Sequence, residues 1–155
     1  MSAAAERLAA LDELPATELC ARAESALNEL VAIMNEETTL LRAGSFRQAG
    51  GLTPDKTRLA QDYVGYARSV QRQIGRLRDE APVELERLQN GHERLATQMA
   101  ENLKVIASAR NLTDALLSET ANMVAARERT KTYDESGTVP AITQGSTGIA
   151  VRKSL

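Results

Sequence analysis

The chain has 155 residues, of which 43% are hydrophobic and 26% charged, and its formal net charge is −2. This balance is typical of a soluble helical protein, and the charge gives no electrostatic reason to expect nucleic acid or an anionic membrane as a partner. A single cysteine, Cys20, excludes an intramolecular disulfide and is compatible with a reducing compartment. We find no signal peptide and no stretch approaching a membrane span, so we expect a cytoplasmic protein.

The first half of the chain predicts one short helix and two long ones. The short helix is expected over residues 3–14. The first long helix is expected over residues 17–43, where apolar residues recur at helical spacing and Gly44 is placed as a C-terminal cap. The second is expected over residues 54–80, because a capping hydroxyl followed by Pro54 is a strong helix start.

A third helix, expected over residues 82–130, carries the longest regular pattern in the sequence. Residues 85–127 keep an unbroken heptad seam, and such a repeat holds one stripe of a helix against a partner over many turns. This helix would be about 70 Å long, against about 40 Å for each of the other two. Pro82 marks either a tight corner between antiparallel helices or a kink in one continuous rod, and we favour the corner.

These elements predict an all-α fold, namely an elongated antiparallel helical bundle or coiled coil of three main helices. We expect a single domain over residues 1–131 and a disordered, flexible tail over residues 132–155, where Gly, Ser and Thr are frequent. If the three helices pack as neighbours, about 20 residues at the end of the third helix project beyond the other two. An isolated helix with an apolar stripe is not stable alone in water.

The apolar face of this overhang is the candidate binding surface. It needs a second copy of the chain, the N-terminal segment folding back, or a client protein to cover it. The alternative interpretation is an ordinary frayed end of a long helix. The candidate residues are Leu112, Thr113, Leu116, Leu117, Thr120, Met123 and Val124.

Sequence patterns for catalysis, metal binding and nucleotide binding are missing. With one histidine, His92, paired Glu-x-x-His elements cannot be assembled, and no glycine-rich loop followed by Lys-Ser or Lys-Thr supports a phosphate site. We expect His92 to be partly buried in the heptad seam and Cys20 to be a buried or inert thiol. Arg68, Arg72 and Arg76 form a basic stripe, for which solvated or intrabundle roles are favoured over nucleic-acid binding. We therefore expect neither enzyme activity nor a cofactor.

Four short motifs follow one another along the chain. They are Asn35-Glu36-Glu37-Thr38-Thr39-Leu40-Leu41 before a break at Gly44, a helix restart at Leu52-Thr53-Pro54-Asp55-Lys56, a long helix that bears Asn102, and Tyr133-Asp134-Glu135-Ser136-Gly137 at the start of the tail. This order, which covers most of the chain, resembles that of the flagellar export chaperones of the FlgN type.

The resemblance implies a cytosolic chaperone for the hook-filament junction proteins of the flagellum. Such a chaperone binds helical terminal segments of those subunits before secretion and delivers them to the membrane protein of the export gate. The family's gate-contacting tyrosine falls on Tyr133. A helix laid in an apolar groove binds through anchors three and four residues apart and needs no nucleotide or metal. The competing interpretation is a coiled-coil structural or regulatory adaptor whose overhang forms a homodimer and which has no export role.

Overall fold

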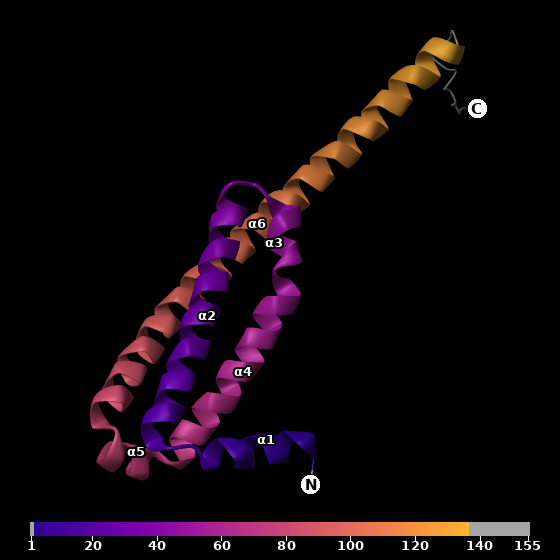
Figure 1. Ribbon diagram of the computed structural model, residues 1–155. Helices are drawn as coiled ribbons and strands as arrows, with labels where there is room; N and C mark the ends of the chain where they lie inside the picture. The colour runs from indigo at the N-terminus through magenta and orange to yellow at the C-terminus, as the bar shows by residue number, and fades with distance from the viewer. Residues whose placement is uncertain (1, 137–155) are drawn as a thin grey trace, which may run out of the picture. The chain divides into compact units, whose positions relative to one another are not determined.

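The computed structural model describes the backbone of residues 2–136 and the side chains of residues 2–132. The helices are α1 (Ala3–Asp12), α2 (Ala16–Arg42), α3 (Phe46–Gly51), α4 (Thr53–Arg72), α5 (Ile74–Glu80) and α6 (Pro82–Ser136), as Figure 1 shows. The all-α fold predicted from the sequence is confirmed, and the part of the chain that the structure describes contains no strand.

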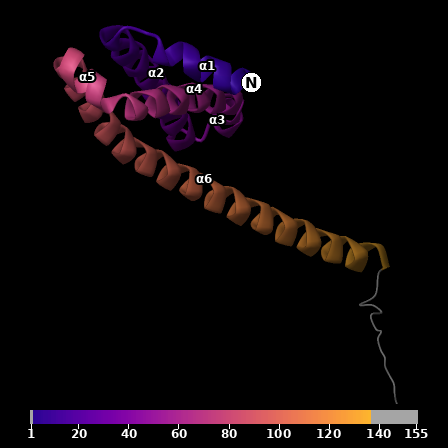
Figure 2. The ribbon, with the colours of Figure 1, turned by 90° about the horizontal axis from the view of Figure 1, so that it is seen from below.

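The chain divides into two units, residues 1–109 and residues 110–155, and the boundary lies within the residues assigned to α6. The first unit contains α1 to α5 and the beginning of α6. There α2 and α4 run side by side in opposite directions, connected by α3, and α5 leads from α4 into α6 (Figures 1 and 2). The second unit, as far as it is described, is helical up to Ser136.

Three helix boundaries differ from the expected ones or define them more closely. The helix expected over residues 54–80 is interrupted at Gln73, whose backbone has φ −107° and ψ 15° and whose side chain forms hydrogen bonds with both α1 and α4. Ala81 has φ −143° and ψ 54°, so Pro82 begins a new helix at a corner, as proline disfavours helical geometry in the residue before it. The last helix continues past the expected end near residue 130 because no Gly or Pro occurs before Gly137.

The core of the first unit is built around α2. Two groups of buried apolar side chains follow its length, one near each end of the bundle. The first group contains Leu19, Cys20, Ala23, Val70, Leu77, Leu85 and Leu88, and the second contains Leu27, Leu30, Met34, Leu59, Tyr63 and Leu95. Cys20 is buried, which confirms that expectation, and burial raises the pKa of its thiol.

The expectation that His92 is partly buried was wrong, because its neighbour Gly91 occupies the contact with α2. A Cβ atom added to Gly91 would lie 2.6 Å from Leu27 Cδ2, so the absence of a side chain permits this close approach. Gly91 is buried and His92 is exposed. The imidazole Nδ1 lies 2.6 Å from the Tyr63 hydroxyl, and desolvation of that hydroxyl raises the pKa of Tyr63.

A buried polar cluster joins three helices beyond the last buried leucine of α6. Asn102 is 3% exposed. Its Nδ2 donates to Glu37 Oε1 at 2.8 Å, to Thr38 Oγ1 at 3.1 Å and to the Met34 carbonyl at 3.3 Å. The Lys56 ammonium donates to Glu37 Oε1 at 2.8 Å and to Asn102 Oδ1 at 3.3 Å. The cluster therefore connects α2, α4 and α6 through hydrogen bonds that depend on their axial register.

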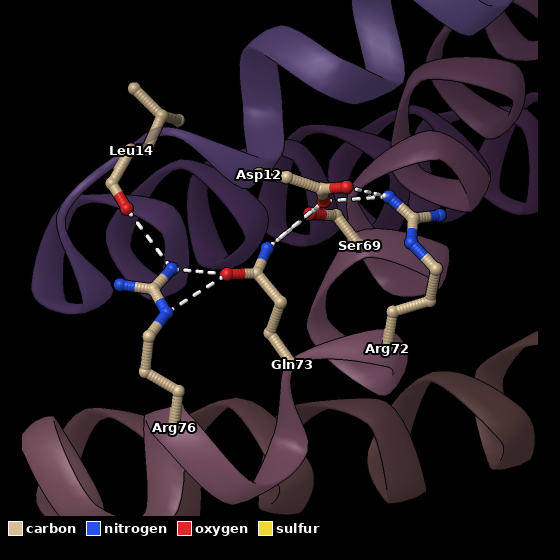
Figure 3. A network of polar contacts seen from close by, with 6 residues as sticks. All are labelled: Asp12, Leu14, Ser69, Arg72, Gln73 and Arg76. Atoms are coloured by element: carbon tan, nitrogen blue, oxygen red, sulfur yellow. Dashed lines mark hydrogen bonds and ion pairs between the residues drawn. The ribbon is translucent and has the colours of Figure 1, made fainter.

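A second polar cluster anchors the end of α1 (Figure 3). Asp12 accepts hydrogen bonds from the Ser69 hydroxyl at 2.7 Å, from the Arg72 guanidinium at 2.6 Å and from Gln73 Nε2 at 3.0 Å. Arg76 donates to the Leu14 carbonyl at 3.1 Å. The hydrogen bond from Arg72, aided by that from Ser69, holds the pKa of Asp12 below its ordinary value of 3.8.

We expect Asn102→Leu to lower the free energy of unfolding of the first unit by about 1–3 kcal/mol, because Glu37 and Thr38 lose a buried donor. The measurement is urea denaturation followed by circular dichroism. Asn90→Leu is the matched control, since Asn90 is exposed on the same helix. Equal effects of the two substitutions would contradict a stabilising role for the buried amide.

We expect Asp12→Asn to loosen α1 at neutral pH, and the difference from the wild-type protein to vanish in acid. The pKa of Asp12 is lowered in the folded state, so its stabilising contribution is complete above pH 3.8 and is lost as the pH falls through the folded value. Asp12 and Arg72 side chains are 38% and 44% exposed, so solvent screening limits the contribution of the pair to about 1 kcal/mol. Limited proteolysis at residues 3–14 across pH measures the effect, with Glu13→Gln as the control. A difference that persists in acid would contradict the role of the ionised carboxylate.

Candidate functional site

The predicted binding face lies on a stretch of α6 whose side chains are all exposed. Every residue from 110 to 132 is exposed. Large apolar side chains recur within this stretch, and their exposed fractions range from 50% for Leu116 to 65% for Met123. The five large apolar residues are Leu112, Leu116, Leu117, Met123 and Val124. These five residues of the predicted binding face therefore lie on an exposed helical surface.

The seven predicted residues share one side of the helix. At about 100° per residue, Leu112 and Leu117 mark the edges of an arc of about 140° that contains the other five. We call this surface the α6 face. It is broader than the narrow seam of a two-stranded coiled coil, which uses only two positions in seven.

The hydroxyl group of Thr120 does not make the α6 face more polar. Its Oγ1 donates to the Leu116 carbonyl oxygen at 2.8 Å. This bond within the helix satisfies the hydroxyl locally and leaves the methyl group as the part available to a partner. Leu116 and Thr120 therefore form a continuous apolar strip along the helix axis.

The charged residues of this stretch flank the α6 face or lie at its end. By helical position, Asp114 and Glu119 fall on opposite flanks, and Arg127 lies on the same side as the face, one turn beyond Met123. A partner helix with a carboxylate near Arg127 would therefore be favoured electrostatically. The arrangement can select the direction in which a partner helix lies along the face.

Tyr133 is the one predicted site residue whose side chain lies outside the described residues. Its backbone belongs to α6, which ends at Ser136. It lies nine positions after Val124, which corresponds to about 13 Å along a helix axis. Tyr133 and the α6 face are thus consecutive but separate positions on one helix.

The basic stripe noted in the sequence serves mainly within the bundle. Arg72 forms an ion pair with Asp12, and Arg76 donates to the Leu14 carbonyl oxygen. These two residues therefore have intrabundle roles, as favoured from the sequence. Among the described residues, no group of three histidine, cysteine or acidic side chains could hold a metal ion, and no described helix is long and apolar enough to cross a membrane.

The sequence did not reveal two hollows on the first unit. One of about 660 Å³ is lined by Tyr63, Val70, Leu88 and His92, among others, where α4 and the beginning of α6 flank α2. The other, of about 890 Å³, lies between α1 and α4. Both depend on contacts between residues far apart in the chain, which hydrophobic periodicity does not report.

Comparisons with protein-family models, with curated proteins and with solved structures found no match to this chain. The similarity to FlgN-type chaperones therefore rests on the order of sequence motifs alone.

Proposed function

We propose that this protein is a cytosolic chaperone that binds helical terminal segments of flagellar hook-filament junction proteins and delivers them to the export gate. The observation that carries the proposal is the exposed α6 face. Five large apolar side chains lie there in positions suited to a partner helix. The order of the sequence motifs, which resembles that of FlgN-type chaperones, supports a flagellar junction protein as the partner and the export gate as the destination.

The energetics of the α6 face suit a partner that must later be released. Fully burying one such side chain contributes about 1.5–3 kcal/mol. The five side chains are 50–65% exposed, so covering them would yield a similar fraction of the full value, or about 4–9 kcal/mol in total. Association itself costs about 4–15 kcal/mol. Binding then depends on apolar surface supplied by the partner, which favours a moderate affinity.

The position of Tyr133 supports separate client-binding and gate-binding sites along α6. The client would occupy residues 112–124, and Tyr133 would contact the membrane protein of the export gate from the next turns of the same helix. The separation of about 13 Å along the axis allows both contacts at once. In this arrangement a loaded chaperone keeps its gate-binding residue accessible.

A homodimeric coiled-coil adaptor is the second candidate. The heptad seam over residues 85–127 continues from the bundle into the exposed stretch, and a second copy could cover the α6 face. Sedimentation at decreasing protein concentration separates the two functions. A dimer that persists on dilution supports the adaptor, and a monomer that captures junction subunits from its own cells supports the chaperone.

We expect Leu116→Asp to weaken client binding at least about 30-fold, the factor that corresponds to about 2 kcal/mol for a central interface residue. Client capture from cells and titration of the captured subunit measure the effect. Ser118→Asp is the matched control, because Ser118 is exposed on the opposite side of the same helix. Both variants should keep the helix content of the wild-type protein. Loss of binding in both would contradict a specific α6 face.

We expect Tyr133→Ala to impair export of the client while leaving its affinity for the chaperone unchanged, because the residue lies outside the α6 face. Secretion of the junction subunit and its affinity in solution are measured in parallel. Tyr133→Phe serves as the control that keeps the aromatic ring. A fall in client affinity in Tyr133→Ala would show that the two roles are not separate.

A further inference from the structure

A second open apolar surface lies on the first unit, between α1 and α4. The groove has a volume of about 890 Å³, near the upper end of the range of about 300–1,000 Å³ found for ligand pockets. Apolar side chains from both helices form part of its walls, beside polar and charged ones. The apolar ones are Ala4, Leu8, Ala10 and Leu11 on α1 and Ala60, Val64 and Tyr66 on α4.

The walls of this groove are partly accessible to solvent. Ala4, Ala10 and Val64 are exposed, and Leu8, Leu11, Ala60 and Tyr66 are half-buried. None of the ten residues of α1 is buried, and Val64 is 45% exposed. α1 therefore retains apolar surface that another segment could cover. Covering it would stabilise α1, because a short helix gains most of its stability by burying an apolar face. A small ligand would remain largely uncovered in such an open groove, whereas a peptide helix could contact side chains of both walls.

α1 is attached firmly at only one end. Asp12 binds Ser69, Arg72 and Gln73 (Figure 3). Over residues 3–10, by contrast, the described chain has no ion pair or side-chain hydrogen bond between α1 and α4. The groove can therefore adjust its width near the beginning of α1 while the Asp12 cluster holds the other end.

The charged rim of the groove indicates the chemistry of its partner. The Lys56 ammonium forms an ion pair with Glu37, and Asp62 Oδ2 lies 3.4 Å from Arg58 Nη1. Arg7 and Arg68 also line the groove, and neither has a carboxylate partner among the described residues. Guanidinium groups form strong charge-assisted hydrogen bonds with carboxylates. The rim therefore favours an acidic partner.

We propose that the groove between α1 and α4 binds an amphipathic helical segment of another protein that carries carboxylates beside its apolar anchors. This site is separate in sequence from the α6 face and does not depend on the chaperone function proposed above. Leucine-sized anchors three or four residues apart would contact Leu8, Leu11 and Val64. Carboxylates on the flanks would pair with Arg7 and Arg68.

The test uses the full-length chain and two fluorescent helical peptides. One peptide has leucines spaced three and four residues apart with glutamates on the flanks, and the other has lysines in place of the glutamates. Fluorescence anisotropy measures affinity, and methyl NMR locates the site. We expect the acidic peptide to bind at least about tenfold more tightly than the basic one, and to shift the methyl signals of Leu8 and Val64.

Charge reversal provides the decisive variant. Arg7→Glu combined with Arg68→Glu should reverse the preference between the two peptides. Arg47→Glu combined with Arg78→Glu is the matched control, because it changes the net charge equally at exposed residues that do not line the groove. Leu116→Asp should leave the methyl shifts of Leu8 and Val64 caused by the acidic peptide unchanged, which separates this site from the α6 face.

Four results would overturn the proposal. The first is the absence of binding by the acidic peptide, and the second is equal affinity of the two peptides. The third is an unchanged preference in the charge-reversed variant, and the fourth is a set of NMR shifts confined to residues 112–124. Val64→Asp adds a check on the apolar wall, because this exposed substitution should abolish binding while circular dichroism shows an unchanged helix content.

Discussion

The hydrogen-bonding requirement of one buried amide fixes how α6 joins the bundle. A buried polar side chain is costly unless its donors and acceptors are satisfied, and Asn102 finds its partners on α2 and α4. Sliding α6 along α2 would break these bonds and would also move a larger residue into the space beside Leu27 that Gly91 leaves. Burial of the apolar residues Leu85 and Leu95 supplies stability, and the polar cluster supplies a single register.

The sequence predicted the helices well and their contacts less well. Heptad spacing reports that one side of α6 is apolar, but it does not report which residue approaches α2 most closely. Gly91, not His92, makes the close approach to α2, because a residue without a side chain lets the two helix backbones come nearer. The end of α6 was placed too early because the change in composition after residue 131 suggested a tail, whereas no helix-breaking residue occurs before Gly137.

Only one of the two candidate binding surfaces could be predicted from the sequence. The α6 face could be predicted because its residues lie close together along one helix, where regular spacing is informative. The groove between α1 and α4 could not. Its geometry depends on bonds from Asp12 to residues 57 to 61 positions away in the chain. No local pattern indicates that Asp12 binds Ser69, Arg72 and Gln73 rather than solvent.

The run of exposed residues on α6 also links affinity to conformational entropy. A partner for the α6 face requires residues 112–124 to be helical, and any fraction of the time that they are not reduces the apparent affinity. Ala115, Ala125 and Ala126 lie outside the face by helical position. Alanine has the highest intrinsic helix propensity, so these residues lower the cost of keeping the segment ordered. If a partner helix binds the α6 face, the strength of that binding therefore depends in part on side chains that the partner does not contact.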